Sequence, residues 1–276
     1  MKGRGASDKR RQPQRRTVMK IGAMLHSFRK PTFRENVEAA AALKLDGVQV
    51  LVQSDLPMDT VHEYLDIIKS NGMVVSALCG DIGGAYDTPE EVNRKLPIFK
   101  RILELSVAFE CGIVTTHIGA IPENNPATYD IMFNACREMA EHAKSVGAKF
   151  AIETGPEKAA VLRAFLDDIG MDSAGVNLDP ANLVMCVADD PAKAAEILKP
   201  YIFHTHAKDG IKTGETSYLE VPLGQGGVHF DTYLPALYST GFDGFLTIER
   251  EVGDQPERDI QLATDFLREM TARYGI

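Results

Sequence analysis

Eight repeats of one pattern run through this sequence. Each repeat is a short apolar run that ends in a polar residue or glycine, followed by a longer stretch with apolar residues at helical spacing. The apolar runs are 20–26, 47–52, 73–81, 112–120, 149–155, 174–180, 201–209 and 244–251. Strands that alternate with helices are typical of parallel βαβ units. Eight such units in about 250 residues predict an α/β fold of the (β/α)8 TIM-barrel type.

The stretches between the runs have the spacing of amphipathic helices. They predict helices over 33–45, 58–72, 89–110, 126–146, 156–169, 191–199, 229–240 and 255–274. Pro97 lies inside the third stretch, where we expect a kink or a break because proline lacks a backbone N–H group. An open doubly wound sheet is the competing arrangement, but no glycine-rich phosphate loop opens a helix here, which disfavours it.

The charge of the chain is unevenly distributed. Residues 1–18 hold seven Lys or Arg and one Asp, so their net charge is +6. The net charge of the whole chain is −9, so the remaining residues carry −15. We interpret residues 1–18 as a basic, disordered extension without function, with Met19 as an alternative start. A nucleic-acid-binding arm or an organelle transit sequence is the other interpretation. Residues 19–276 are expected to form one catalytic barrel domain, whose acidic charge disfavours nucleic acid as a partner.

The cysteines and the apolar runs indicate the compartment. Cys79, Cys111, Cys136 and Cys186 form no CxxC pair, and no secretory segment precedes them. No apolar run approaches the roughly 20 residues of a membrane helix. We therefore expect reduced thiols in a cytoplasmic protein that has no membrane partner.

Polar residues occur where each predicted strand ends, which is the end of such a barrel that carries the active site. These residues are His26, Gln49, Gln53, Asp81, His117, Glu153, Asp179, His206, Lys208, Glu249 and Glu251. Side chains alternate along a strand, so in the seventh run Phe203 and Thr205 oppose His204 and His206. We expect the large apolar groups to face the helices and the polar groups to face the barrel axis.

Glu153, Asp179, His206 and Glu249 would then meet at one level of the barrel. Three carboxylates that pack together repel one another, and a divalent cation removes this repulsion. Oxygen ligands with one imidazole suit Mn²⁺, Mg²⁺ or Co²⁺, and Zn²⁺ after them. We expect one such ion, with Mn²⁺ as the first choice.

Single members of this set have simpler explanations. Asp179 can be a turn residue or a helix cap. His204 is expected to be a hydrogen-bonded core histidine, one layer deeper than His206. Glu251 is expected to be a rim charge or a partner of Arg250. The hypothesis of a metal site therefore depends on the set as a whole.

Four segments in the second half of the chain carry a family resemblance. They are GVNLDPANL (175–183), HTHAKDG (204–210), VPLGQGGVHF (221–230) and GFDGFLTIEREVG (241–253). As a group they resemble the xylose isomerase-like TIM-barrel superfamily, which contains sugar phosphate isomerases and epimerases together with endonuclease IV of AP endonuclease family 2. The resemblance extends over residues 19–274, although the first half is only generically similar.

The resemblance implies a mechanism and a ligand set. Ketose 3-epimerases of this superfamily hold one divalent metal through Glu, Asp, His and Glu, which correspond here to Glu153, Asp179, His206 and Glu249, with His204 as the fallback for His206. The two glutamates also serve as acid and base in those enzymes. The implied enzyme is a divalent-metal-dependent epimerase or isomerase of a small ketose or sugar phosphate. It would remove a proton and return one through a metal-stabilised enediolate. If one group both removed and returned the proton, the same site would isomerise the sugar.

Four further residues are expected to bind the substrate. Asn182 falls where relatives place a His or Asn near the sugar. His26 and His117 are expected to line the pocket, and Lys208 or His117 to hold an oxyanion or a hydroxyl group. Dimers and tetramers are common among relatives, which allows a homo-oligomer here, and the sequence leaves the oligomeric state open.

Other functions stay open at this point. Metal-dependent dehydratases of keto-inositols or keto-sugars reuse similar ligands, and a barrel that binds a sugar without catalysis is a further alternative. An endonuclease IV-like phosphodiesterase would need more histidines and a basic groove. Glu157 and Lys212 lie near the places where the ketose 3-epimerases carry a further Glu and an Arg, without a clean match. The resemblance therefore leaves the sugar and its phosphorylation open.

Overall fold

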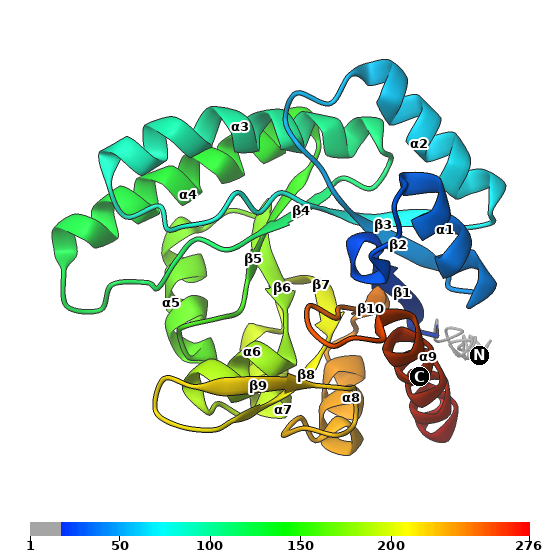
Figure 1. Cartoon of the computed structure of the whole chain (residues 1–276). Helices are drawn as coiled ribbons and strands as arrows, with labels where there is room; N and C mark the ends of the chain where they lie inside the picture. The colour runs from blue at the N-terminus through cyan, green and yellow to red at the C-terminus, as the bar shows by residue number, and fades with distance from the viewer. Residues whose placement is uncertain (1–17) are drawn as a thin grey trace, which may run out of the picture.

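Eight parallel strands close into a barrel in the computed structural model, which describes residues 18–276 (Figure 1). In their order around the barrel the strands are β1 (Lys20–Met24), β10 (Phe245–Ile248), β7 (Ile202–Ala207), β6 (Ala174–Leu178), β5 (Lys149–Glu153), β4 (Ile113–Thr116), β3 (Val74–Cys79) and β2 (Gly47–Leu51). Each strand lies within one of the eight predicted runs. The prediction of a (β/α)8 barrel is therefore confirmed.

Helices cover the outside of the barrel between successive strands (Figure 1). They are α1 (Phe33–Ala42), α2 (Met58–Ser70), α3 (Pro89–Ala108), α4 (Pro126–Val146), α5 (Ala159–Ile169), α7 (Pro191–Leu198), α8 (Phe230–Ser239) and α9 (Pro256–Tyr274). Helix α3 continues through Pro97, so the break expected there does not occur. The neighbouring side chains Leu96 and Phe99 are buried in the core, and such packing supplies most of the stability of a helix in a protein.

Short elements at the carboxyl ends of the strands were not predicted. They are η1 (Leu25–Phe28), α6 (Pro180–Asn182), the π-helical segment η2 (Leu183–Val187) and an antiparallel hairpin of β8 (Asp209–Lys212) with β9 (Tyr218–Val221). The run 201–209 contains the end of one strand and the start of another, because β7 stops at Ala207 and the chain turns into the hairpin. The hairpin lies between β7 and α8 in the chain (Figure 1).

The two faces of the barrel strands differ in chemistry, as the alternation predicts. On the outward face, Phe150 of β5 contacts Phe99 of α3 edge to face at 5.4 Å, and both are fully buried. On the inward face, Asn177, His204 and Thr247 are equally buried. Buried polar groups are stable in a protein only when they have hydrogen-bond partners. The interior of the barrel is therefore organised by the hydrogen bonds of these side chains.

The amino-terminal prediction concerns residues that the structure does not describe. The expectation of a disordered basic extension over residues 1–18 lies outside the described residues, apart from Val18, which is exposed. Among residues 18–276, none of the helices has the length and apolar character needed to cross a membrane.

Candidate metal centre and substrate pocket

Four side chains meet at the carboxyl ends of four adjacent strands. Glu153 ends β5, Asp179 follows β6, His206 lies near the end of β7, and Glu249 follows β10. One potential ligand atom from each residue lies within 4.8 Å of the other three, and all four residues are buried. Because side chains alternate with a period of two, the inward position on each strand directs these groups to one place on the axis.

The carboxylates of this cluster surround the ring of His206. Its Nδ1 lies 3.3 Å from Glu153 Oε1, 3.3 Å from Glu249 Oε2 and 3.6 Å from Asp179 Oδ2. Asp179 Oδ1 accepts two backbone N–H groups at the start of α6, whereas Oδ2 is buried and has no hydrogen-bond partner within residues 18–276. Buried carboxylates are costly without a compensating cation. The donor set therefore fits a divalent metal ion.

Gln49 of β2 reaches the other nitrogen of His206. Gln49 Nε2 donates to Thr115 Oγ1 at 2.8 Å, and Gln49 Oε1 lies 2.8 Å from His206 Nε2. The Gln49 oxygen therefore accepts the Nε2–H group of His206. The lone pair of the neutral imidazole is then on Nδ1, the atom that faces the carboxylates, as a metal ligand requires. The sequence placed Gln49 at this end of the barrel but contained no signal for this contact.

A second layer of polar side chains supports the cluster. Asn177 Nδ2 donates to Glu153 Oε2 at 3.0 Å, and Asn177 Oδ1 accepts from His204 Nδ1 at 2.9 Å. Thr247 Oγ1 lies 2.9 Å from His204 Nε2. Burial lowers the pKa of His204, so this imidazole is neutral. The structure thus brings His206 to the carboxylates and keeps His204 in the layer below. The sequence did not identify Asn177 as a supporting residue, although its position two residues before Asp179 places the two side chains on the same face of the strand.

The charges in the cluster stabilise one another. Burial disfavours the charged form of His206, but Glu249 and Glu153 outweigh it and hold the pKa of this imidazole well above its ordinary value. Burial likewise opposes ionisation of Glu249, but His206 and Lys208 hold the pKa of Glu249 well below its ordinary value. A metal ion needs the neutral form of His206, so its binding releases a proton.

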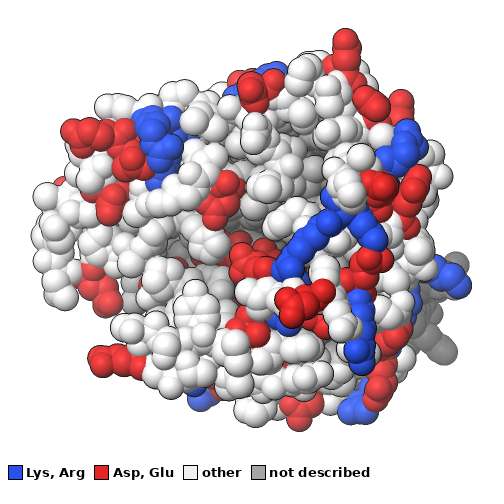
Figure 2. Space-filling model, viewed as in Figure 1, with Lys and Arg blue, Asp and Glu red and all other residues white. Residues whose placement is uncertain are grey.

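A pocket of about 420 Å³ opens at the carboxyl end of the barrel, where Glu153 and Glu249 line it. Its lining also contains the four predicted substrate-binding residues, which are His26, His117, Asn182 and Lys208. Figure 2 shows this face of the molecule hollowed near its centre, with acidic side chains in the hollow. The structure therefore brings the predicted residues together, and their individual roles stay predictions.

His117, which follows β4, lies between two carboxylates. Its Nδ1 is 2.7 Å from Asp81 Oδ2, and its Nε2 is 3.7 Å from Glu153 Oε1. Glu153 raises the pKa of His117 to about 9 against the effect of burial, and the hydrogen bond to Asp81 adds to the increase. His117 therefore presents a positive charge to the pocket at neutral pH. In contrast, burial lowers the pKa of His26, so this imidazole is uncharged at neutral pH.

Lys208 is a buried cation surrounded by carboxylates. Its Nζ lies 3.0 Å from Glu249 Oε2 and 3.9 Å from Glu220 Oε2, and it also contacts the carboxylate of Glu251. Glu251 is exposed, as expected for a rim charge. The alternative expectation, a pairing of Glu251 with Arg250, is not met, because Arg250 pairs with Glu220 and Asp259.

Glu157 and Lys212 are not among the residues that line the pocket. Lys212 Nζ donates to the backbone oxygens of Met185 and Cys186 at 3.3 and 2.8 Å, so it ties the hairpin to η2. Glu157 is buried, and neither of its carboxylate oxygens has a hydrogen-bond partner within residues 18–276.

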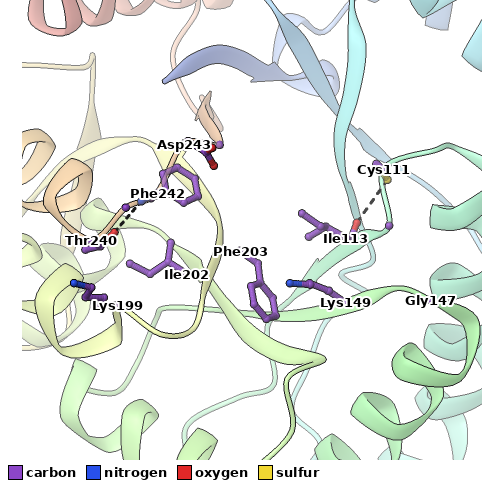
Figure 3. Close-up of a pocket in the computed structure, with 13 residues that line it drawn as sticks. Cys111, Ile113, Gly147, Lys149, Lys199, Ile202, Phe203, Thr240, Phe242 and Asp243 are labelled. Carbon is purple, nitrogen blue, oxygen red and sulfur yellow. Dashed lines mark hydrogen bonds between the residues drawn. The ribbon is translucent and has the colours of Figure 1, made fainter. Parts of the chain in front are cut away.

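A second cavity, of about 500 Å³, lies at the amino-terminal end of the barrel (Figure 3). Its lining residues include no histidine and no glutamate. The ring of Phe203 occupies part of this end, because a Cβ atom on Gly175 would lie 2.4 Å from it, and Lys149 Nζ lies 4.1 Å from its centroid. Phe203 was expected to face the helices, but a register irregularity between β6 and β7 turns it inward. The candidate chemistry is thus at the other end, as in barrels of this type.

These features define a (β/α)8 barrel with a buried candidate metal centre and a polar pocket at the carboxyl ends of its strands. The family model described as xylose isomerase-like TIM barrel matches residues 37–270. The chain therefore belongs to the xylose isomerase-like TIM barrel family, and the resemblance seen in its sequence is confirmed.

Two relatives match most of the chain. An uncharacterized protein of Methanocaldococcus jannaschii is 27% identical over 253 residues, which are 84% of this chain and 84% of that protein. The crystal structure of a xylose isomerase domain protein from Planctomyces limnophilus is 25% identical, with a TM-score of 0.81, and the match covers 86% of this chain and 92% of that one.

More distant solved structures share the fold. They include a D-tagatose 3-epimerase-like protein, a xylose isomerase-like TIM barrel protein from Mycobacterium smegmatis in complex with magnesium, and the probable 3-DHS dehydratase from Bacillus anthracis. Their TM-scores are 0.74 to 0.76 at 17% to 18% identity, and the matches cover 91% to 92% of this chain and 97% to 99% of theirs.

Proposed function

We propose that this protein is a divalent-metal-dependent epimerase or isomerase that acts on a small keto-sugar. The observation that carries the proposal is the placement of Glu153 and Glu249. Each has an oxygen 3.3 Å from His206 Nδ1, and they come from β5 and β10, which are separated by β6 and β7. Two carboxylates on different sides of one site can reach the two faces of a substrate carbon.

The ligand set supports the metal. A divalent ion bound by Glu153, Asp179, His206 and Glu249 would supply a Lewis acid that acidifies the C–H group next to a substrate carbonyl. A set rich in carboxylate oxygen with one imidazole favours Mn²⁺ first, followed by Mg²⁺, Co²⁺ and Zn²⁺. The magnesium complex of the Mycobacterium smegmatis barrel supports a divalent ion in a protein of this fold.

The surrounding side chains suit the two glutamates to proton transfer. Asn177 and Asn182 donate to Glu153 and fix its orientation. Lys208 stabilises the carboxylate of Glu249, which makes that group the weaker base of the pair. Glu153 is therefore assigned as the group that removes the proton, which it then releases to solvent. Glu249, ionised at rest, is assigned as the group that takes a proton from solvent water and delivers it to the other face, which inverts the carbon. Proton return by Glu153 to the neighbouring carbon would isomerise the sugar instead.

The relatives support this class of reaction and one alternative. The structures that share the fold include a protein named as D-tagatose 3-epimerase-like and another named as a probable dehydratase. Dehydration also begins with loss of a proton next to a carbonyl and ends with loss of a hydroxyl group. His117, held protonated near Glu153, is a suitable acid for that departure. Dehydration is therefore the second candidate.

Solvent exchange tests the proposal directly. The Mn²⁺-loaded protein is incubated in D₂O with a panel of ketoses and keto-inositols, and deuterium incorporation is followed by NMR. We expect incorporation at one carbon with an epimer or isomer as product, and loss of incorporation with EDTA or in Glu153→Gln, which lacks the base that removes the proton. The exposed control Glu196→Gln should exchange as wild type does. Exchange with a dehydrated product would select the second candidate, and absence of exchange with every compound would refute both.

A further inference from the structure

The cavity at the amino-terminal end of the barrel takes no part in the proposed reaction. Its volume is about 500 Å³, which is the size of an ordinary site for a small organic molecule (Figure 3). Ile113 and Lys149 line it from the starts of β4 and β5, whereas Phe203 lines it from the start of β7. The cavity therefore lies across the mouth of the barrel.

Three of these lining residues are shown to be neighbours. Ile113 and Lys149 are paired in the register of β4 with β5. Lys149 Nζ lies 4.1 Å from the centroid of the Phe203 ring, which reaches it across β6. The ring fits there because Gly175 of β6 has no side chain, and a Cβ atom on it would lie 2.4 Å from the ring. Ile113, Lys149 and Phe203 thus form one continuous wall of the cavity.

The ammonium group of Lys149 has no acidic partner. Seven of the thirteen lysines in residues 18–276 form ion pairs with Asp or Glu, and Lys149 and Lys199, which both line this cavity, are not among them. A lysine has three N–H donors, and those of Lys149 have no acceptor in the described part of the chain. The contact with the Phe203 ring positions the charge and leaves these donors for a ligand.

Apolar side chains form much of the remaining wall. Ile113, Ile202, Phe203 and Phe242 all line the cavity, and all four are half-buried. The ring of Phe242 lies against Gly244, since a Cβ atom there would be 2.6 Å from it. A ligand with an apolar ring would remove these surfaces from water, which favours its binding.

The two ends of the barrel differ in charge. The lining of the carboxyl-end pocket has four carboxylates and one lysine. The lining of the amino-end cavity has two lysines and one carboxylate, that of Asp243, so its net charge is +1. Residues 19–276 together carry −15. A cavity of positive charge in such an acidic protein attracts an anion.

We propose that the amino-end cavity binds a small aromatic carboxylate. The carboxylate group accepts hydrogen bonds from Lys149 Nζ, and the ring packs against Phe203 and Ile113. An inorganic anion would leave the apolar wall in water, and an uncharged aromatic compound would leave Lys149 without an acceptor. Lys149 and Glu153 lie at opposite ends of β5, about 13 Å apart along the strand. The ligand therefore does not contact the candidate metal centre.

Matched ligands test the proposal. Calorimetry compares 2-naphthoate with 2-naphthamide, which has the same rings without the charge, and with acetate, which has the charge without the rings. We expect 2-naphthoate to bind with a Kd of about 1 mM or lower, as the usual ligand efficiency provides for its size. The amide should bind at least about tenfold more weakly, because it makes no charge-assisted hydrogen bond, and acetate should show no saturable binding.

Metal dependence distinguishes the two ends of the barrel. Each titration is made with the Mn²⁺-loaded protein and with the protein in EDTA. A carboxylate in the carboxyl-end pocket would bind the metal ion, so its affinity would fall in EDTA. Binding at the amino end should have the same affinity in both conditions.

Variants connect the binding to Lys149. Lys149→Met keeps most of the side-chain stem and should weaken 2-naphthoate about tenfold while leaving the affinity for 2-naphthamide unchanged. Lys149→Arg keeps the charge and should retain the preference for the carboxylate. Lys158→Met, a change at an exposed lysine before α5, should bind as wild type does. Circular dichroism spectra that match wild type ensure that folded proteins are compared.

The outcomes are independent of the proposed function, because none of them involves a sugar. Equal affinity for 2-naphthoate and 2-naphthamide, unchanged binding in Lys149→Met, or binding that requires Mn²⁺ would each overturn the proposal. Failure of 2-naphthoate to bind, or binding of acetate as tight as that of 2-naphthoate, would overturn it as well.

Discussion

Gln49 Oε1 lies 2.8 Å from His206 Nε2, and this contact joins residues on β2 and β7, which are not neighbours in the barrel. The contact decides which nitrogen of His206 faces the three carboxylates. Thr115 holds the Gln49 amide in the orientation that this requires. The candidate metal centre thus depends on Gln49, although within residues 18–276 Gln49 forms no hydrogen bond with any of the three carboxylates.

Gln49→Leu should weaken metal binding. The substitution leaves the Nε2–H group of His206 without its acceptor, so the ring is free to place a proton on Nδ1. Loss of such a supporting contact typically reduces metal affinity about 10-fold to 100-fold. Titration calorimetry with Mn²⁺ measures the effect. Gln49→Glu keeps an acceptor at the same position and should bind at least as tightly as wild type, and equal affinity in all three proteins would contradict the assigned role.

The two histidines of β7 should differ in their effect on metal content. His206→Asn should lose bound metal, because Nδ1 is the nitrogen that faces the carboxylates. His204→Asn should keep it while lowering stability by about 1 to 3 kcal/mol, since a buried hydrogen-bonded group is disturbed in the layer below. Elemental analysis of the purified variants provides the measurement. Metal loss in His204→Asn alone would reverse the assignment.

The parts of the fold that sequence predicted are those encoded by local periodicity. Strand β5 was predictable because Phe150 and Ile152 alternate with Ala151 and Glu153. The meeting of Glu153 with Glu249 followed from the same rule, because barrel closure brings all inward positions to one axis. Their burial and proximity needed no long-range information beyond the strand order.

The features that sequence did not predict depend on contacts between distant segments. Gln49 and His206 are separated by 157 residues, and only the closed barrel brings them together. Phe203 follows the alternation in sequence but turns inward where the register between β6 and β7 shifts. The hairpin was hidden because the polar residues Lys208 and Asp209 continue an apolar run, so the end of β7 could not be distinguished from the start of β8.

Metal should stabilise the folded protein through Asp179. This carboxylate has a buried oxygen with no hydrogen-bond partner within residues 18–276, so a bound ion would supply the missing interaction. At a Mn²⁺ concentration 100 times the Kd, the free energy of unfolding should rise by about 2.7 kcal/mol in wild type. Urea unfolding with Mn²⁺ and with EDTA measures the difference. Asp179→Asn keeps an acceptor for the start of α6 and should show no response to Mn²⁺, and an equal response would remove Asp179 from the ligand set.

Glu157 should make stability depend on pH. Burial raises the pKa of this carboxyl to about 7 from 4.5, so the folded protein binds a proton that the unfolded chain has already released. The stabilisation is complete below about pH 4.5 and is lost as the pH rises through 7. Between pH 5 and pH 8, wild type in EDTA should therefore lose up to roughly 3 kcal/mol relative to Glu157→Gln, which cannot ionise. Urea unfolding at both pH values measures this, with the exposed Glu196→Gln as control. Parallel pH profiles for wild type and Glu157→Gln would exclude the effect.

Asp209 should control the order of the hairpin formed by β8 and β9. Its carboxylate is buried and accepts the backbone N–H groups of Gly210, Gly224, Gly226 and Val228. Asp209→Ala leaves these donors without an acceptor, and we expect a loss of about 3 kcal/mol in the free energy of unfolding. Hydrogen exchange measured by mass spectrometry should become faster in residues 209–228 and stay unchanged in α3.

A conservative variant and a control at an exposed position complete this test. Asp209→Asn keeps one oxygen acceptor and should show about half the loss of stability, which separates the hydrogen bonds from the charge. Asp55→Ala, at an exposed aspartate after β2, should change neither quantity. Unchanged exchange in residues 209–228 of Asp209→Ala would show that the hairpin is held by other contacts, and the role of Asp209 would be rejected.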